Sequence, residues 1–177
     1  MKKLSLFGIA WLLALALPAS AEPVPTAPCA DGAEYSTVGL SGAHEDLTPA
    51  AIPSAVDFVT AGGREGIYQD QSVVRFTYRI DVSGSASKPA AQAGDVKVAL
   101  RWDDGFTVSD YDLYVYAANG DFLSRSNSGP LALDLSGTET VFLPEVAHCT
   151  DLRVDILNFS GLPPSEMTLA TTIGDLA

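Results

Sequence analysis

Aspartates cluster in the middle of the chain, where their spacing could serve metal chemistry. Asp103 and Asp104 follow one run of alternating residues, and Asp110 and Asp112 open the next run. If the two predicted strands pair, all four carboxylates converge at one end of a sheet. Calcium takes about six to eight oxygen ligands of this hard type. The cluster therefore predicts a calcium site, with a solvated acidic loop as the alternative.

Two tyrosines follow the second aspartate pair. If Leu113 and Val115 face a core, then Tyr114 and Tyr116 face outwards beside Asp112, because side chains alternate along a strand. Exposed aromatic rings can stack on a sugar or grip a peptide. We therefore expect a ligand-binding surface at Tyr114 and Tyr116. Ordinary cross-strand packing, or cover by the N-terminal extension, is the alternative.

Groups for catalysis are few. The chain has two histidines, and it contains neither a Gly-x-Ser-x-Gly elbow nor a His-Glu-x-x-His zinc helix. We expect His44, with Glu45 and Asp46, in a loop, and His148 at a strand end beside Cys149. The sequence therefore predicts no enzyme. A hydrolase with an unrecognised carboxylate site stays open, because 22 acidic residues offer many pairs.

The first 21 residues have the pattern of an export signal. Lys2 and Lys3 precede an apolar run at 6–17, and Ala19-Ser20-Ala21 forms a small-residue cleavage site. The apolar run is shorter than the roughly 20 residues of a membrane-spanning helix. We expect cleavage and a secreted or periplasmic protein, with an uncleaved anchor as the alternative.

Two cysteines, Cys29 and Cys149, allow a single intramolecular disulfide. An exported chain meets an oxidising compartment, so we expect this disulfide rather than free thiols. Closing so long a loop stabilises by about 4 kcal/mol in the chain-entropy model. Their wide separation argues against a Cys-x-x-Cys redox site.

The composition restricts the partners. The chain has 177 residues and a net charge of −12, which becomes −14 when the signal takes its two lysines with it. An acidic surface repels phosphate backbones and anionic lipids. We therefore expect no nucleic acid and no membrane insertion after signal removal. Exported or periplasmic proteins and polysaccharides remain as partners.

The elements that must position these residues are short strands. Residues 22–72 are rich in proline and glycine and predict an irregular extension with short strands near 35–40 and 56–60. From residue 73 onwards, apolar and polar residues alternate with the period of half-buried strands. Asn119-Gly120 predicts a type I′ hairpin turn. The predicted strands are Val74–Val82, Val96–Trp102, Tyr111–Tyr116, Phe122–Ser126, Leu131–Leu135, Thr140–Leu143, Leu152–Leu157 and Met167–Ile173.

This pattern predicts an all-β domain. About eight short strands separated by turns, without a sustained helical period, favour an antiparallel β-sandwich of the jelly-roll-like kind. The Trp102 side chain is expected in the core, on the same face as Val98 and Leu100. We divide the chain into a signal peptide at 1–21, an extension at 22–72 and the sandwich at 73–177.

The strand at 110–116, which reads Asp-Tyr-Asp-Leu-Tyr-Val-Tyr, resembles the bacterial pre-peptidase C-terminal domain family. Asn119-Gly120, Ser126 and the stretches 152–161 and 167–172 extend the resemblance over roughly residues 73 to 173. It implies a jelly-roll-like, non-catalytic module of the kind appended to exported enzymes, and some related modules bind calcium or extracellular polymers. This chain departs from that pattern because no peptidase is attached.

The sequence thus leads to one main functional hypothesis. We expect a secreted, non-catalytic binding or accessory module that is stabilised by calcium. A structural or protein-interaction domain without a bound ion is the alternative.

Overall fold

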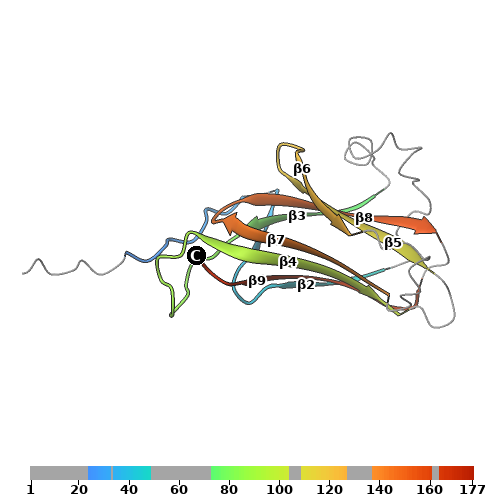
Figure 1. Ribbon diagram of the computed structural model, residues 1–177, viewed down its shortest axis with the longest axis horizontal. Coiled ribbons are helices and arrows are strands. Elements are labelled where there is room, and N and C mark those ends of the chain that lie inside the picture. The colour runs from blue at the N-terminus through green and yellow to red at the C-terminus, as the bar shows by residue number, and fades with distance from the viewer. Residues whose placement is uncertain (1–23, 33, 49–72, 104–108, 127–136, 161–163) are drawn as a thin grey trace, which may run out of the picture.

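The structure is a computed structural model that describes residues 24–32, 34–48, 73–103, 109–126, 137–160 and 164–177. The described part contains nine strands and no helix, and two sheets pack face to face (Figure 1). The predicted export signal, the strands at 56–60 and 131–135 and Asp104 lie outside the described residues. The strands are β1 Ser36–Val38, β2 Ala43–Leu47, β3 Val74–Ile80, β4 Ala93–Trp102, β5 Asp110–Ala117, β6 Phe122–Ser126, β7 Thr138–Ala147, β8 Asp151–Ser160 and β9 Met167–Gly174.

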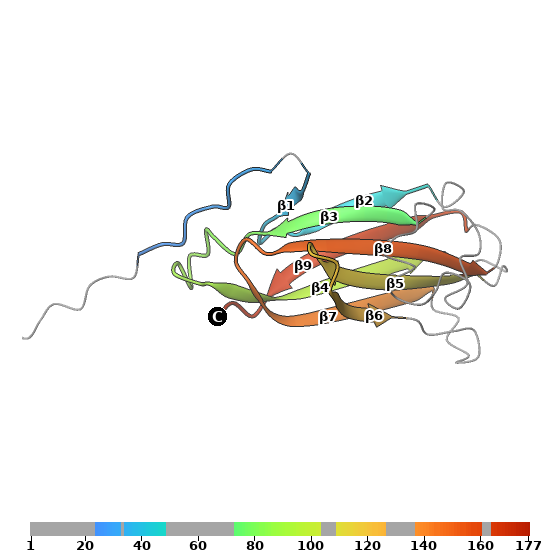
Figure 2. The ribbon, with the colours of Figure 1, turned by 90° about the horizontal axis from the view of Figure 1, so that it is seen from above.

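The two sheets divide the strands in an order that differs from the chain order. One sheet has five strands in the order β1-β3-β8-β5-β6, and the other has four in the order β2-β9-β4-β7 (Figure 2). Only β1 and β3 pair in parallel; every other described pair is antiparallel. The fold is therefore the predicted antiparallel-dominated β-sandwich.

Consecutive strands β4 and β5 do not pair. β4 hydrogen-bonds to β7 and β9 in the four-stranded sheet, and β5 hydrogen-bonds to β6 and β8 in the five-stranded sheet. The expectation that these two strands pair is therefore wrong. β4 and β5 each pair with strands from the C-terminal half of the chain. Their apolar side chains contribute to one core between the two sheets.

The core lies between the sheets and follows the alternation in the sequence. In β4 the side chains of Val96, Val98 and Leu100 are buried, whereas those of Lys97 and Arg101 are exposed. Trp102 packs against this core, and its ring meets the Tyr111 ring edge-on at 5.3 Å between centroids. The predicted inward direction of Trp102 is confirmed.

The strand β2 was not expected. Ala43–Leu47 contains His44, Glu45 and Asp46, which the sequence places in a loop, but it pairs with β9 over its whole length. The segment has too few apolar residues to show strand periodicity. Its backbone hydrogen bonds to β9 come from tertiary contact, which a local pattern does not reveal.

The hairpin between β5 and β6 forms as predicted, but its turn is of another type. Gly120 has φ 92°, and Asn119 does not have the positive φ that a type I′ turn requires. Gly120 N–H donates to Ala117 O, and Ala117 N–H donates to Asp121 O, each at 2.9 Å. This is a three-residue loop, which tolerates an ordinary backbone at Asn119.

The predicted disulfide joins Cys29 to Cys149, with 5.5 Å between the Cα atoms. It ties the N-terminal segment to the turn between β7 and β8. Hydrogen bonds continue the attachment, because Thr26 N–H donates to Pro89 O at 2.7 Å and the Thr26 hydroxyl donates to Ala91 O at 2.6 Å. The start of the extension is therefore part of the folded domain.

Gly42 allows the chain to pass from one sheet to the other between β1 and β2. Its φ is 76°, and its N–H donates to Gly39 O at 2.8 Å. A Cβ atom at this position would lie 2.7 Å from the carbonyl oxygen of Thr171 in β9. Both the backbone conformation and the space therefore require glycine here.

We predict that Gly42→Ala lowers the free energy of unfolding by about 2–3 kcal/mol, because it combines a left-handed backbone with a clash against backbone. Denaturant unfolding of the purified protein measures this change. Gly39→Ala is the control: nothing lies within 4 Å of its Cβ, so its effect is expected to be small. Equal losses in the two variants would contradict this role of Gly42.

Candidate functional site

The predicted calcium cluster is divided between the two sheets. Asp103 is exposed just beyond β4, while Asp110 and Asp112 are buried in β5. One group of three or more histidine, cysteine or acidic side chains in the described residues is close enough to hold a metal, and it contains none of these aspartates. The described aspartates therefore do not form a ready-made site by themselves.

Burial raises the proton affinity of both β5 aspartates, and repulsion from neighbouring carboxylates adds to this for Asp112. Asp112 is 7% exposed. Its pKa rises to about 6, first through burial and then through the charges of Asp110 and Glu139, although the Tyr114 hydroxyl and Arg125 oppose the rise. Burial also raises the pKa of Asp110. At neutral pH the pair therefore holds negative charge in a place that disfavours it.

Tyr114 and Tyr116 do not form the exposed aromatic surface predicted above. They lie on the face of β5 away from the main core, but both are fully buried. Tyr116 meets the Phe122 ring edge-on at 5.8 Å, and the Tyr114 hydroxyl donates to Asp112 at 3.3 Å. Burial, helped by the Asp112 charge, raises the pKa of Tyr114 to about 12. The prediction of an exposed aromatic surface is therefore wrong, and Tyr116 makes the cross-strand contact with Phe122 that one of the two alternatives describes.

Ion pairs cross-link the rest of this face. The Asp155 carboxylate is fully buried and accepts from Arg75 at 3.0 Å and from Arg153 at 2.7 Å. Asp151 accepts two hydrogen bonds from Arg79 at 2.7 and 2.8 Å. Register explains the choice of partners, because Arg75 stands opposite Asp155, and Arg79 opposite Asp151. This face therefore directs its charged groups to one another rather than to a ligand.

The outer surface of the four-stranded sheet has a different character, and we call it the open face. At its centre, β4 presents Lys97 and Arg101, and neither forms an ion pair among the described residues. Phe142 of β7 stands opposite Lys97 and is 56% exposed. The other side chains of the open face are short or polar: His44, Asp46, Asp95, Ala99, Thr138, Thr140, Thr168, Ala170 and Thr172.

A shallow depression ends the open face beside the last residues of β4 and the first of β9. Its volume is about 200 Å³. Side chains of both signs meet there, and the lining residues are Arg101, Trp102, Asp103, Glu166, Met167 and Thr168. The depression joins Asp103, one of the predicted metal ligands, to the open face rather than to Asp110 and Asp112.

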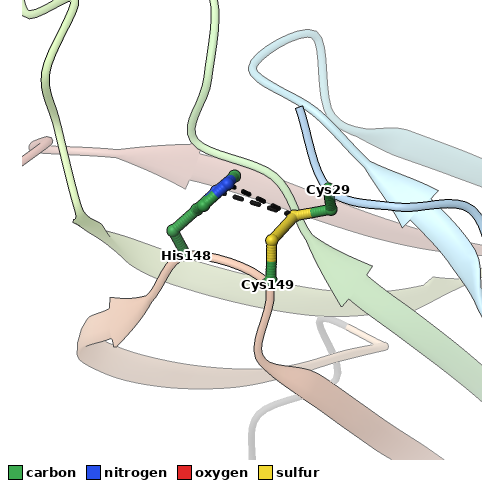
Figure 3. Close-up of side chains that lie close together, drawn as sticks. All are labelled: Cys29, His148 and Cys149. Carbon is green, nitrogen blue, oxygen red and sulfur yellow. Dashed lines mark hydrogen bonds between the residues drawn. A yellow bond between two sulfur atoms is a disulfide. The ribbon is translucent and has the colours of Figure 1, made fainter. Parts of the chain in front are cut away.

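The disulfide lies in a corner that also holds His148. The imidazole of His148 lies against the bridge, with Nδ1 and Nε2 each 3.6 Å from Cys29 Sγ (Figure 3). Nε2 lies 2.9 Å from Ala27 O, which only accepts, so Nε2 carries the proton. Nδ1 accepts from Val82 N–H at 3.3 Å. In the neutral form of the imidazole, these two contacts select the tautomer with the proton on Nε2.

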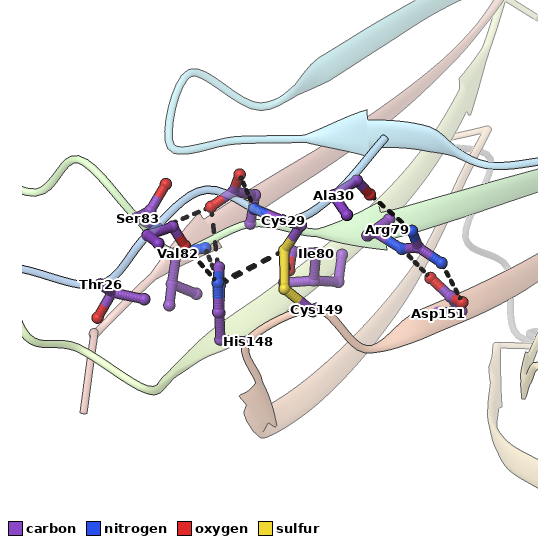
Figure 4. The surroundings of a disulfide bond; sticks show 12 residues. Thr26, Cys29, Ala30, Arg79, Ile80, Val82, Ser83, His148, Cys149 and Asp151 are labelled. Atoms are coloured by element: carbon purple, nitrogen blue, oxygen red, sulfur yellow. Dashed lines mark hydrogen bonds and ion pairs between the residues drawn. A yellow bond between two sulfur atoms is a disulfide. The ribbon is translucent and has the colours of Figure 1, made fainter. Parts of the chain in front are cut away.

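Asp81 lies in the same corner, and Figure 4 shows the surroundings of the disulfide there, with Cys29, Ser83 and His148. The Asp81 carboxylate accepts from Ser83 N–H at 2.8 Å and from Cys29 N–H at 3.1 Å, and it lies 3.6 Å from His148 Nδ1. Burial raises the pKa of Asp81, but these hydrogen bonds and His148 together hold it below its ordinary value. An ionised Asp81 therefore anchors the segment that contains Cys29.

Sequence reasoning missed the open face and the role of His148. The alternation of Lys97, Ala99 and Arg101 in β4 indicated a polar face, but nothing local showed that Phe142 would stand exposed opposite Lys97. His148 was expected at a strand end, and it does follow β7 directly. Its contact with Cys29 depends on the disulfide, which brings together residues 119 positions apart.

No helix of the described residues is long and apolar enough to cross a membrane. The disulfide is consistent with an oxidising compartment. Comparison with known proteins gives no assignment, because no family model and no curated protein matches the chain.

We predict that Asp112→Asn stabilises the metal-free protein at neutral pH by about 1–2 kcal/mol, because it removes a buried charge. The raised pKa makes the folded state bind the proton more tightly than the unfolded state. Wild-type stability should therefore fall as pH rises from 3.8 to about 6. Thermal melts across this range test both points.

The exposed Asp31 supplies the control for this charge change. Asp31→Asn should leave the wild-type pH profile intact, whereas Asp112→Asn should flatten it. A destabilised Asp112→Asn protein with an unchanged profile would contradict the analysis of this buried pair.

Proposed function

We propose that the chain is an exported, non-catalytic accessory module that binds a neutral polysaccharide on its open face. One observation carries the proposal: the outer surface of the four-stranded sheet presents the exposed Phe142 ring opposite Lys97, with Arg101 further along β4, and neither cation forms an ion pair among the described residues. The sandwich supplies a rigid support for that surface, since all three side chains stand on strands rather than loops.

The chemistry of the open face suits a sugar polymer. The exposed Phe142 ring offers an apolar surface on which a sugar ring can stack. Lys97, Arg101 and the neighbouring threonine hydroxyls supply hydrogen-bond donors, and sugar hydroxyls accept such bonds. The central Ala99 and Ala170 are small, which keeps the middle of the face low enough for an extended chain to approach.

Charge favours a neutral polymer over a polyanion. The chain carries a net charge of −12, and removal of the predicted signal makes it more negative. Such a protein repels nucleic acids and acidic polymers at long range. The two cations of the open face then act as local donors rather than as the footprint of a polyanion.

Two sequence features support export and an accessory role. The N-terminal charge, apolar run and Ala-Ser-Ala site are those of a secretory signal. The strand at 110–116 and its hairpin resemble the pre-peptidase C-terminal domain family, whose members accompany exported enzymes without catalysing a reaction.

Calcium belongs to the proposal as a stabilising ion rather than as a catalyst. Asp110 and Asp112 are buried together, and the pKa of both is raised. A cation beside them would stabilise two carboxylates whose pKa is raised mainly by burial, and carboxylates are preferred calcium ligands. Asp103 and Asp104, on the connection that leads to β5, remain the further predicted ligands.

A protein-interaction domain is the second candidate, and a separate surface favours it. An apolar recess of about 270 Å³ opens between the edge strands β6 and β7. It is lined by Leu123, Leu143, Pro144, Val146, Ala147, Thr150 and Leu152. Leu123 is 42% exposed there, so an apolar side chain of a partner protein could fill the recess.

We predict that Phe142→Ala reduces binding to neutral polysaccharides about tenfold or more, because stacking on an aromatic ring is lost. Affinity electrophoresis and pull-down with insoluble cellulose, chitin and xylan measure the effect. Leu123→Ala is the matched control, since it removes an exposed apolar side chain from the other sheet. It should leave sugar binding unchanged.

The salt dependence separates this proposal from polyanion binding. Affinity for a neutral polymer should change little with salt, whereas counterion release makes polyanion binding fall steeply. Retained binding in the Phe142 variant, or no binding to any neutral polymer, would contradict the proposal. Release of soluble sugars during the assay would instead support the hydrolase hypothesis.

We predict that millimolar calcium raises the melting temperature relative to EDTA. A ligand present at about a hundredfold excess over its Kd stabilises the native state by about 2.7 kcal/mol. The increase should disappear in an Asp110→Asn, Asp112→Asn double variant and persist in Asp31→Asn. An equal increase in the double variant would show that calcium binds somewhere other than Asp110 and Asp112 in β5.

A further inference from the structure

We propose that the disulfide corner becomes a zinc site when the disulfide is reduced, with Cys29, Cys149 and His148 as the three protein ligands. Their ligand atoms all lie within 4.8 Å of one another, and they are the one such group in the described residues. In the oxidised protein the two sulfurs bond to each other, so the same residues serve as a cross-link. The inference concerns a site separate from the open face and does not depend on the proposed function.

The distances suit tetrahedral zinc. Zinc binds thiolate sulfur at about 2.3 Å and histidine nitrogen at about 2.0–2.1 Å, so two such ligands on a tetrahedral ion lie about 3.6 Å apart. His148 Nδ1 is already 3.6 Å from Cys29 Sγ. Rotation of the Cys149 side chain, which sits in an exposed turn, would provide the second sulfur. Because Nε2 is equally far from this sulfur, the sulfur lies over the ring face, and His148 must rotate to direct its in-plane Nδ1 lone pair at an ion.

The surroundings of His148 prepare Nδ1 to bind a metal. Metal-binding histidines commonly donate their other ring N–H to a carbonyl or carboxylate, which fixes the tautomer. Here Nε2–H donates to Ala27 O at 2.9 Å, so Nδ1 keeps its lone pair. The single bond that Nδ1 accepts, from Val82 N–H, is long at 3.3 Å, and zinc would replace it.

Charge in the corner favours a divalent cation. Two thiolates and the neutral imidazole neutralise Zn²⁺, and the ionised Asp81 lies 3.6 Å from Nδ1. Asp81 also holds the Cys29 backbone through Cys29 N–H, which keeps Cys29 beside β3 after the disulfide opens. The fourth position on the ion is left to water, as in zinc sites with three protein ligands.

Reduction requires an external dithiol. The exposure of the two cysteines determines which sulfur the dithiol attacks first. A thiolate of the dithiol attacks the sulfur of Cys149, which is exposed, and Cys29, which is buried, leaves as a thiolate. The second thiol of the reductant then releases Cys149 and forms the reductant's own disulfide. Two electrons and two protons have reached the protein, and Zn²⁺ displaces the two thiol protons on binding.

Cobalt titration of the intact protein tests the site. The protein is reduced with a phosphine, which is removed under nitrogen, and Co²⁺ is added. We expect a thiolate-to-cobalt charge-transfer band, strong visible d–d bands of a tetrahedral ion, and displacement of one cobalt by one Zn²⁺. The oxidised protein should show none of these bands.

Two histidine variants make the assignment specific. His148→Ala should weaken cobalt and zinc binding by at least about tenfold, which is the usual scale for losing support at a metal site. His44→Ala, which removes the exposed histidine of the open face, should bind as the wild type does. Absent bands after reduction, or equal affinity in the two variants, would overturn the proposal.

A second measurement covers the case in which the protein unfolds when the disulfide is reduced. If the reduced protein loses its near-ultraviolet circular dichroism, Zn²⁺ should restore that signal, because metal binding contributes to folding when the ligands meet only in the native state. Calcium at the same concentration should not restore it. Failure of zinc to restore the signal would overturn the proposal as surely as absent cobalt bands.

Discussion

Burial of apolar side chains between the two sheets is the constraint on which the rest of the structure depends. Strand side chains alternate, so placing Val96, Val98 and Leu100 in the core forces Lys97 and Arg101 to the opposite surface. The same rule in β5 places Leu113 inwards and Tyr114 outwards. Each sheet therefore turns an apolar face inwards, and its outer face carries most of the charged side chains, which in the five-stranded sheet surround the buried cluster of Tyr114 and Tyr116.

The outer faces of the two sheets differ in how their charged side chains are paired. On the five-stranded sheet, register sets arginines opposite aspartates, and Asp155 is buried between Arg75 and Arg153. Removing such a carboxylate from water is offset by its two cations, which direct their donors to it. On the four-stranded sheet, Lys97 and Arg101 have threonines and Phe142 as cross-strand neighbours. The absence of a carboxylate opposite them leaves their donors available.

The disulfide corner shows how a stabilising link can place reactive groups together. Cys29 reaches the sandwich through the bond to Cys149, through the Asp81 carboxylate and through Ala27 O at His148. Arg79 adds a further link, since it donates to Ala30 O at 2.7 Å while it pairs with Asp151. These contacts hold an otherwise irregular segment against β3, which is why an imidazole meets a sulfur there.

The sequence by itself determined the all-β class, most strand positions and the pairing of the two cysteines, because alternation is a local property and the chain has two cysteines. It also predicted the core positions of Trp102 and Leu113 correctly. Only the tertiary structure decided that β4 and β5 lie in different sheets, that β2 is a strand and that Tyr114 and Tyr116 are buried. These features depend on which distant strand supplies the neighbouring backbone and side chains, and the free energy of that choice comes from contacts between residues far apart in the chain.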